Sequence, residues 1–258
     1  MTYCLSLLTV GGFVCFSDSR TNAGVDNITV QPKMRLYCKT GERVLCLTSS
    51  GNLSLTQTLT ALIEEDILRG SENPDHVNMM NRPTMFETAR YVGEKIRCVS
   101  DMDRKALEAD GLRFNINVLL SGQIVGLEHQ IFRIYSPGNA IHASMDSPFL
   151  QIGEFKYGKP ILDRGFRYNT SLEDAIKFGL LSLETTMKSN VSVGTPFDIF
   201  CYERNSLEIR HQIRLHDEDE YLRNLRQQWQ DGLVKLVKEM PGIGFPEMDE
   251  SPPEIRAV

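Results

Sequence analysis

The stretch Phe13-Val-Cys-Phe-Ser-Asp18-Ser-Arg20-Thr-Asn-Ala-Gly24 follows a short apolar run that begins at Thr2. Removal of Met1 would make Thr2 an N-terminal threonine, and such a residue carries its own base. Its α-amine, with an ordinary pKa of about 7.7–8.0, can take the proton of the hydroxyl of the same residue directly or through a water molecule. Taken alone, Thr2 fits an ordinary β-favouring residue behind a retained Met. Together with the residues that follow, it predicts that the mature protein begins at Thr2 and that Thr2 supplies both nucleophile and base.

The Asp-Ser-Arg-x-x-x-Gly block in this stretch resembles the β-subunits of the proteasome, which are N-terminal-nucleophile hydrolases. The residues that match the block are Asp18, Ser19, Arg20 and Gly24. The spacing from Thr2 to Asp18 needs no gap, whereas Lys33 falls one residue short of its usual position. We therefore assume a single deletion within residues 25–32. The resemblance extends from Thr2 to about Tyr202, and it is stronger in the N-terminal part of this range than in the C-terminal part.

A second stretch, Thr48-Ser-Ser-Gly51-Asn-Leu-Ser-Leu-Thr-Gln57, resembles the family's strand-to-helix turn, whose glycine amide forms the oxyanion hole. The resemblance implies that the charge of Lys33 favours the neutral amine of Thr2, because a second positive charge nearby is disfavoured. It also implies that an extended peptide binds as an added strand. The implied catalytic residues are Thr2, Asp18 and Lys33, the oxyanion and substrate residues are Gly51, Asn22 and Ala23, and the supporting residues are Ser19 and Arg20.

Two auxiliary polar positions depart from the family pattern. A Gly-Ser-Gly turn is expected beside the threonine, but the sequence there has Glu154 in place of the serine. An Arg-Asp-x-x-Ser-Gly block is expected later, but Ser189-Asn190-Val-Ser-Val193-Gly194 occupies that position. These changes leave the nucleophile and its two charged neighbours intact and bear on the rate and on the protonation of the amine.

Hydrophobic periodicity predicts an α+β fold. Alternating or continuous apolar runs indicate strands, and apolar residues at helical spacing indicate helices. Strands are predicted at residues 4–10, 13–17, 35–38, 43–47, 114–120, 130–135, 149–152, 197–202 and 207–213, and helices at residues 55–70, 85–99 and 171–187. The resemblance, and not the pattern, implies a four-layer α/β/β/α sandwich.

The chain extends well beyond this pattern. We expect a proteasome-like domain at residues 1–215 and a C-terminal extension at residues 216–258, with an amphipathic helix around Trp229 and an acidic tail. The apolar stripe of this helix is expected to pack on the domain's own helical layer, with a subunit contact as the alternative. A chain preceded by one Met and followed by such an extension is similar to the bacterial proteasome homologues called Anbu. We expect a homo-oligomer, ring-like or helical.

Composition excludes several classes of function. The formal net charge of −6 leaves no basic stripe for a nucleic acid, and no apolar stretch approaches the roughly 20 residues that span a bilayer. The apolar run after Thr2 lacks a basic flank and ends at Gly11-Gly12, so it is not a signal peptide. Six cysteines without paired spacing indicate a reduced, cytoplasmic protein. No cofactor and no metal are expected, because the sequence has no P-loop, H-E-x-x-H or zinc-like cluster.

The sequence is thus interpreted as a threonine endopeptidase that hydrolyses peptides or unfolded proteins through an acyl-enzyme. Two alternatives stay open: a catalytically weak scaffold that assembles into rings or filaments, and an amidase of the same class acting on small acyl amides. Labelling of Thr2 by a threonine-directed inhibitor separates the first from a peptidase, and the choice of substrate separates the second. An unfoldase partner is conceivable, but no residue supports it.

Overall fold

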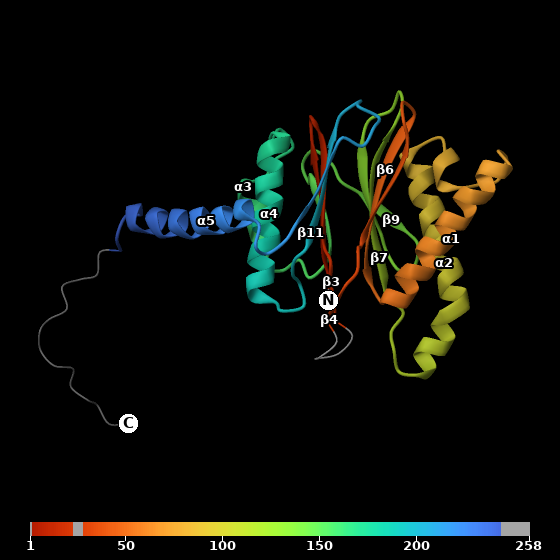
Figure 1. Ribbon diagram of the computed structural model, residues 1–258, viewed down its shortest axis with the longest axis horizontal. Coiled ribbons are helices and arrows are strands. Elements are labelled where there is room, and N and C mark those ends of the chain that lie inside the picture. The colour runs from red at the N-terminus through yellow and green to blue at the C-terminus, as the bar shows by residue number, and fades with distance from the viewer. Residues whose placement is uncertain (1, 23–27, 244–258) are drawn as a thin grey trace, which may run out of the picture.

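Two antiparallel five-stranded sheets lie face to face between helical layers (Figure 1). The computed structural model describes residues 2–22 and 28–243. The first sheet has the order β10 (Phe149–Gly153), β1 (Tyr3–Thr9), β2 (Gly12–Asp18), β11 (Phe197–Glu203) and β12 (His211–Leu215). The second has the order β5 (Met34–Lys39), β6 (Arg43–Gly51), β7 (Ile116–Ile124), β8 (Gln130–Ile134) and β9 (Ala140–His142). The four-layer α/β/β/α architecture is confirmed.

Helices cover the outer face of each sheet (Figure 1). On the second sheet lie α1 (Leu53–Glu72) and α2 (Met85–Ala109), joined through a short 3₁₀ helix at Met79–Asn81. On the first sheet lie α3 (Lys159–Gly165) and α4 (Leu172–Ser189), followed at the end of the chain by α5 (Glu220–Glu239). Side-chain caps begin α1, α2 and α4, since Asn52, Thr84 and Ser171 accept hydrogen bonds from backbone amides of the first turn.

The strand that follows Thr2 lies inside the first sheet. β1 pairs with β2 on one side and with β10 on the other, and all seven of its residues are buried. Leu5 and Leu7 pack toward α3 and α4, whereas Leu8 packs between the sheets. A two-stranded ribbon of β3 (Arg20–Asn22) and β4 (Ile28–Val30) lies at the end of the sandwich where β1 begins (Figure 1). The fold thus holds the start of β1 rigidly at one end of the two sheets.

Some element bounds differ from those expected. The second helix continues to Ala109 instead of ending near Val99, because exposed polar residues continue it beyond the sheet. The strand expected at 207–213 begins at His211, since Asn205 and Leu207 adopt positive φ angles of 64° and 48° in the preceding turn. The short helix α3 was not expected.

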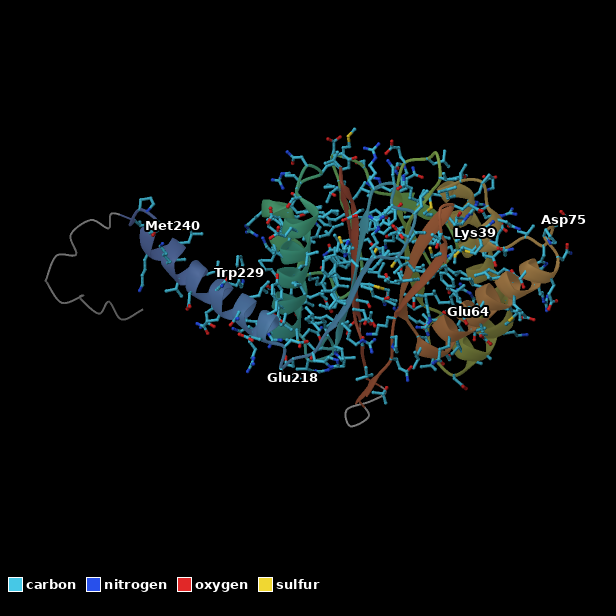
Figure 2. The ribbon with its side chains drawn as sticks, turned by 45° about the horizontal axis from the view of Figure 1, so that its top comes forward. Lys39, Glu64, Asp75, Glu218, Trp229 and Met240 are labelled. Atoms are coloured by element: carbon cyan, nitrogen blue, oxygen red, sulfur yellow. The ribbon has the colours of Figure 1, made fainter. Side chains whose placement is uncertain are left out.

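The last helix departs from the body of the protein (Figure 2). Only Leu222 of α5 is buried, and Leu225 is half-buried against the first sheet's helical layer. Arg226 is bidentate to Glu184 of α4, with distances of 2.6 and 2.8 Å. Beyond Trp229 the apolar residues Leu233, Val234, Leu236 and Val237 are exposed. The expectation that the stripe packs on its own domain holds for the first turns of α5 and is wrong for the rest.

The acidic tail expected at residues 244–258 lies outside the described residues. Within the ranges that the structure describes, no helix has the length and apolarity needed to cross a membrane.

Candidate active site

Hydrogen bonds hold the residue that begins the first strand on both of its sides. The Thr2 carbonyl accepts a hydrogen bond of 2.7 Å from the amide of Glu154, just past β10. The next amide, that of Tyr3, donates to Asp18 Oδ1 at 3.0 Å at the end of β2. Thr2 itself is half-buried and lines a pocket. The backbone around the expected nucleophile is therefore fixed by the first sheet before any ligand binds.

A buried lysine and aspartate lie beside Thr2. Lys33 Nζ is 2.8 Å from Asp18 Oδ1 and also donates to the carbonyl oxygen of Arg20 at 2.6 Å. The side chains of Lys33 and Asp18 are only 9% and 0% exposed. Burial raises the pKa of Asp18, against the opposing effect of the charge and hydrogen bond of Lys33. Asp18 Oδ2 forms no hydrogen bond with the described residues.

The end of β6 brings a glycine amide to the same pocket. Gly51 has a φ of +126°, and a Cβ at this position would lie 2.1 Å from the carbonyl oxygen of Asn115. The amide of Ser49 donates to the carbonyl of Lys33, on the edge of β6 away from β7. Because alternate amides of a strand share an edge, the Gly51 amide lies on that edge too and faces the pocket.

The pocket has a volume of about 230 Å³ and lies between β5, β6 and α1. Its far wall carries Arg35 and Glu64, whose Nε and Oε1 atoms are 4.0 Å apart. The lining residues include Thr2, Lys33, Arg35, Leu47, Ser49, Ser50, Gly51, Thr56, Gln57, Thr60, Ala61 and Glu64. A peptide side chain placed next to Thr2 would therefore meet a mixed polar and apolar surface.

The expected supporting residues form hydrogen bonds with segments that surround the site. Ser19 Oγ donates to Asp198 Oδ2 of β11 at 3.0 Å, and Arg20 donates to the carbonyl of Val191 at 3.0 Å. Asn22 ends β3, where its backbone pairs with Ile28. Ala23 and Gly24 lie outside the described residues, so the predicted peptide contacts of Asn22 and Ala23 stay predictions.

Sequence reasoning missed two features of the site. Asp198 links Ser19 to Arg214, which it binds through distances of 2.7 and 2.9 Å. Its acidic side chain inside an apolar strand was a signal that could have been followed. Asn190 Nδ2 donates to Glu154 Oε2 at 3.2 Å, so the two positions that depart from the proteasome pattern contact each other. No local pattern connects residues this far apart in the sequence.

Solved structures with the same fold cover almost the whole chain. Anbu from Hyphomicrobium sp. strain MC1 is 40% identical, with 94% of this chain and 100% of that chain covered and a TM-score of 0.86. Anbu (ancestral beta-subunit) from Yersinia bercovieri is 39% identical, with 95% and 100% covered and a TM-score of 0.87. The chain belongs to the Anbu family. The resemblance to proteasome β-subunits is thereby confirmed.

A third Anbu structure concerns an assembly. The helical assembly of the Anbu complex from Pseudomonas aeruginosa contains a subunit that is 36% identical, with 94% of this chain and 98% of that chain covered and a TM-score of 0.87. No protein-family model matches the chain, and no curated protein matches it. Membership in the Anbu family therefore rests on the solved structures.

Proposed function

We propose that this Anbu subunit is a threonine endopeptidase in which Thr2, freed of Met1, is the nucleophile. The observation that supports this most is the placement of Thr2, Lys33 and the Gly51 amide around one pocket, with Asp18 bound to Lys33 at 2.8 Å. Three groups that acyl transfer needs, a nucleophile, a fixed positive charge and an oxyanion donor, thus share one space.

The chemistry proceeds through an acyl-enzyme. Thr2 Oγ attacks the scissile carbonyl while the Thr2 α-amine takes the hydroxyl proton, and the Gly51 amide donates to the developing oxyanion. Loss of one such donor costs about 2.7–4 kcal/mol in other enzymes. The amine then gives its proton to the leaving amine, and an activated water molecule releases the acyl group and regenerates Thr2. Asp18 holds Lys33 in place through this cycle.

The decisive experiment combines the mass of the N-terminus with covalent labelling. We expect mature protein that begins at Thr2 and that forms an adduct on Thr2 with a threonine-directed inhibitor, together with hydrolysis of peptides. Thr2→Ala should abolish labelling and hydrolysis, whereas Thr58→Ala, a half-buried residue on α1 that does not line the pocket, should change neither. A protein that retains Met1 and hydrolyses peptides at the full rate would contradict the proposed base. Faster hydrolysis of acylated amino acids than of peptides would instead favour the small-amide amidase.

We also propose that the subunit forms a homo-oligomer through α5. Apolar residues on the outer half of this helix are exposed in the single chain, and contiguous exposed apolar surface is typical of interaction sites. The Anbu of P. aeruginosa is described as a helical assembly. A catalytically weak scaffold is the second candidate function, and the same exposed helix supports it.

For either function, we place the end of the proteasome-like domain at residue 215. The free cysteines of the described residues suit a reducing, cytoplasmic location.

Truncation after Leu215 tests this assembly. We expect the truncated chain to lose most of its association while the pocket around Thr2 still accepts the inhibitor, because α5 lies on the far side of the first sheet's helices. Light scattering measures the mass, and intact protein carrying Arg223→Ala, an exposed residue in the first turns of α5, serves as the matched control. A full-length chain that stays monomeric at micromolar concentration would rule out the proposed oligomer.

A further inference from the structure

Glu154 lies directly opposite Thr2 across the edge of the first sheet. The antiparallel register of β1 and β10 pairs Tyr3 with Gly153, and one step further it places Glu154 opposite Thr2. The Glu154 amide donates to the Thr2 carbonyl at 2.7 Å. This is one of the two backbone hydrogen bonds that directly opposite residues can exchange in an antiparallel pair. Glu154 is therefore the immediate neighbour of the expected N-terminal residue.

The approach of these two residues depends on a glycine. Gly153 has a φ of +84°, and a Cβ at this position would lie 1.8 Å from the Thr2 carbonyl oxygen. Any other residue would push β10 away from the start of β1. The backbone is thus built so that Glu154 closes on Thr2.

Strand alternation places the nitrogen of Thr2 on the side of this neighbour. The amide of Tyr3 points to the opposite edge of β1, where it donates to Asp18 on β2. Successive amides of a strand point to opposite edges, so the Thr2 nitrogen lies on the β10 edge. Once Met1 is removed, an α-ammonium group is left facing Glu154.

The Glu154 carboxylate is held in this region by the end of α4. Asn190 Nδ2 donates to Glu154 Oε2 at 3.2 Å. Asn190 is itself fixed, because its amide caps α4 on the Thr186 carbonyl and its Oδ1 accepts from the Ser192 amide at 2.9 Å. Among the described residues, Glu154 takes part in no ion pair. The residue opposite Thr2 thus carries an anchored carboxylate without a cation, and processing creates a cation at Thr2.

We propose that the Glu154 carboxylate, held by Asn190, is the counter-ion of the mature Thr2 α-ammonium. This inference rests on the proposed function only in requiring a free Thr2. The pair opposes Lys33, whose positive charge disfavours a second one beside it, and so Glu154 keeps more of the amine protonated at neutral pH. Glu154 therefore sets the pH at which the amine becomes a base.

Other charged groups face the site from the neighbouring elements. Lys33 and Asp18 lie behind Thr2, and Arg35 and Glu64 form the far wall of the pocket. Arg20 is bound to the Val191 carbonyl, next to Asn190. All of these are kept in the variants below, so a shift on changing Glu154 reports on Glu154.

The test is a titration of the N-terminal amine. Full-length protein is released from a ubiquitin fusion so that Thr2 is its first residue, and the fraction of amine acetylated by acetic anhydride is measured against pH by mass spectrometry. We expect Glu154→Gln to lower the midpoint by about 0.5–1 pH unit. Asn190→Ala should give a smaller shift in the same direction. Glu72→Gln, an exposed acid at the end of α1, removes the same charge and should leave the midpoint unchanged.

The outcomes separate this pair from the proposed peptidase. Coincident titrations of the parent and Glu154→Gln would overturn the ion pair, even if peptides are hydrolysed. A shifted midpoint without any hydrolysis would support the pair and refute the peptidase. If both hold, the acid limb of kcat/KM should move to lower pH in Glu154→Gln by the same amount as the amine midpoint.

Discussion

Two buried aspartates, each bound to a lysine, occupy very different surroundings in this protein. Asp66 lies between α1 and α2, where Oδ1 is 3.0 Å from His76 Nε2 and Oδ2 accepts from the Tyr91 hydroxyl at 2.6 Å and from Lys95. Asp18 lies beside the pocket, with Oδ1 bound and Oδ2 without a hydrogen bond among the described residues. Both oxygens of the Asp66 carboxylate have hydrogen-bond partners, whereas only one oxygen of the Asp18 carboxylate has them among the described residues.

The difference shows in how protons bind to the two groups. Burial favours the neutral form of Asp66, but the hydrogen bonds from Lys95, Tyr91 and His76 outweigh it and lower its pKa to about 2. At Asp18 burial prevails and raises the pKa, despite Lys33. The fully paired Asp66 stabilises the helix pair, whereas we propose that Asp18, beside the pocket, holds Lys33 in place for the reaction.

The largest expected effect is on activity at the Thr2 site. Lys33→Ala should lower kcat/KM for peptides by about 10²-fold or more, because the charge that favours the neutral amine is lost. The free energy of unfolding should also fall by about 3 kcal/mol or more, because Asp18 is completely buried and its carboxylate loses its partner.

A double variant separates these two effects. Lys33→Met combined with Asp18→Asn removes both charges and should unfold near the parental urea midpoint while remaining inactive. An active double variant would mean that neither charge serves the reaction.

The next effect concerns stability alone. Asp66→Asn should lower the free energy of unfolding by about 2–3 kcal/mol, because three partners of one carboxylate lose a charged acceptor. Peptide hydrolysis should be unchanged, since the Asp66 cluster does not line the pocket. Urea unfolding and kcat/KM are measured together, and a selective loss of activity would break the contrast between the two acids.

The pH dependence of stability should have opposite signs at the two acids. The lowered pKa of Asp66 contributes about 2–3 kcal/mol that is present above pH 4 or so and is lost as the pH falls through about 2. The raised pKa of Asp18 gives a contribution that is present at acid pH and is lost as the pH rises through that pKa. Urea midpoints between pH 2 and 7 check both. Asp66→Asn should reduce the fall of the urea midpoint at acid pH, whereas Asp75→Asn, which changes an exposed acid nearby, should leave that fall unchanged.

The smallest effect should come from Tyr91. Tyr91→Phe removes one hydrogen bond of Asp66 and should cost about 1–2 kcal/mol. The fall of the urea midpoint at acid pH should then begin at a slightly higher pH. No change in either quantity would show that Lys95 and His76 suffice to saturate Asp66.

The sequence predicted most of the fold because its strands and helices bury clear apolar faces. The expected strands at 13–17 and 149–152 lie within observed strands, and residues 171–187 nearly match α4. Short elements such as α3 and β9 carry too few residues for a period to appear. The layer order came from the proteasome resemblance, because pairing of distant strands leaves no local signal.

The contact between Asp18 and Lys33 at the candidate site was predictable from the sequence, but the contacts between residues of separate elements were not. A contiguous block of sequence contains Asp18, and the structure brings Lys33 to it as the assumed deletion requires. The Asp66 cluster and the contact of Glu154 with Asn190 join residues from separate elements. Only the folded chain reveals such contacts.

The pairing of β1 with β10 bears on when Met1 is removed during synthesis. Thr2 is half-buried once Glu154 binds its carbonyl, so trimming of Met1, which the proposed chemistry requires, is easiest on the nascent chain. β10 begins at Phe149, and at about 5–20 residues per second of synthesis the ribosome needs roughly 7–30 s to reach it. During that interval the first residues have no partner on the β10 side. An aminopeptidase that acts at the ribosome therefore meets the first residues before they pair with β10.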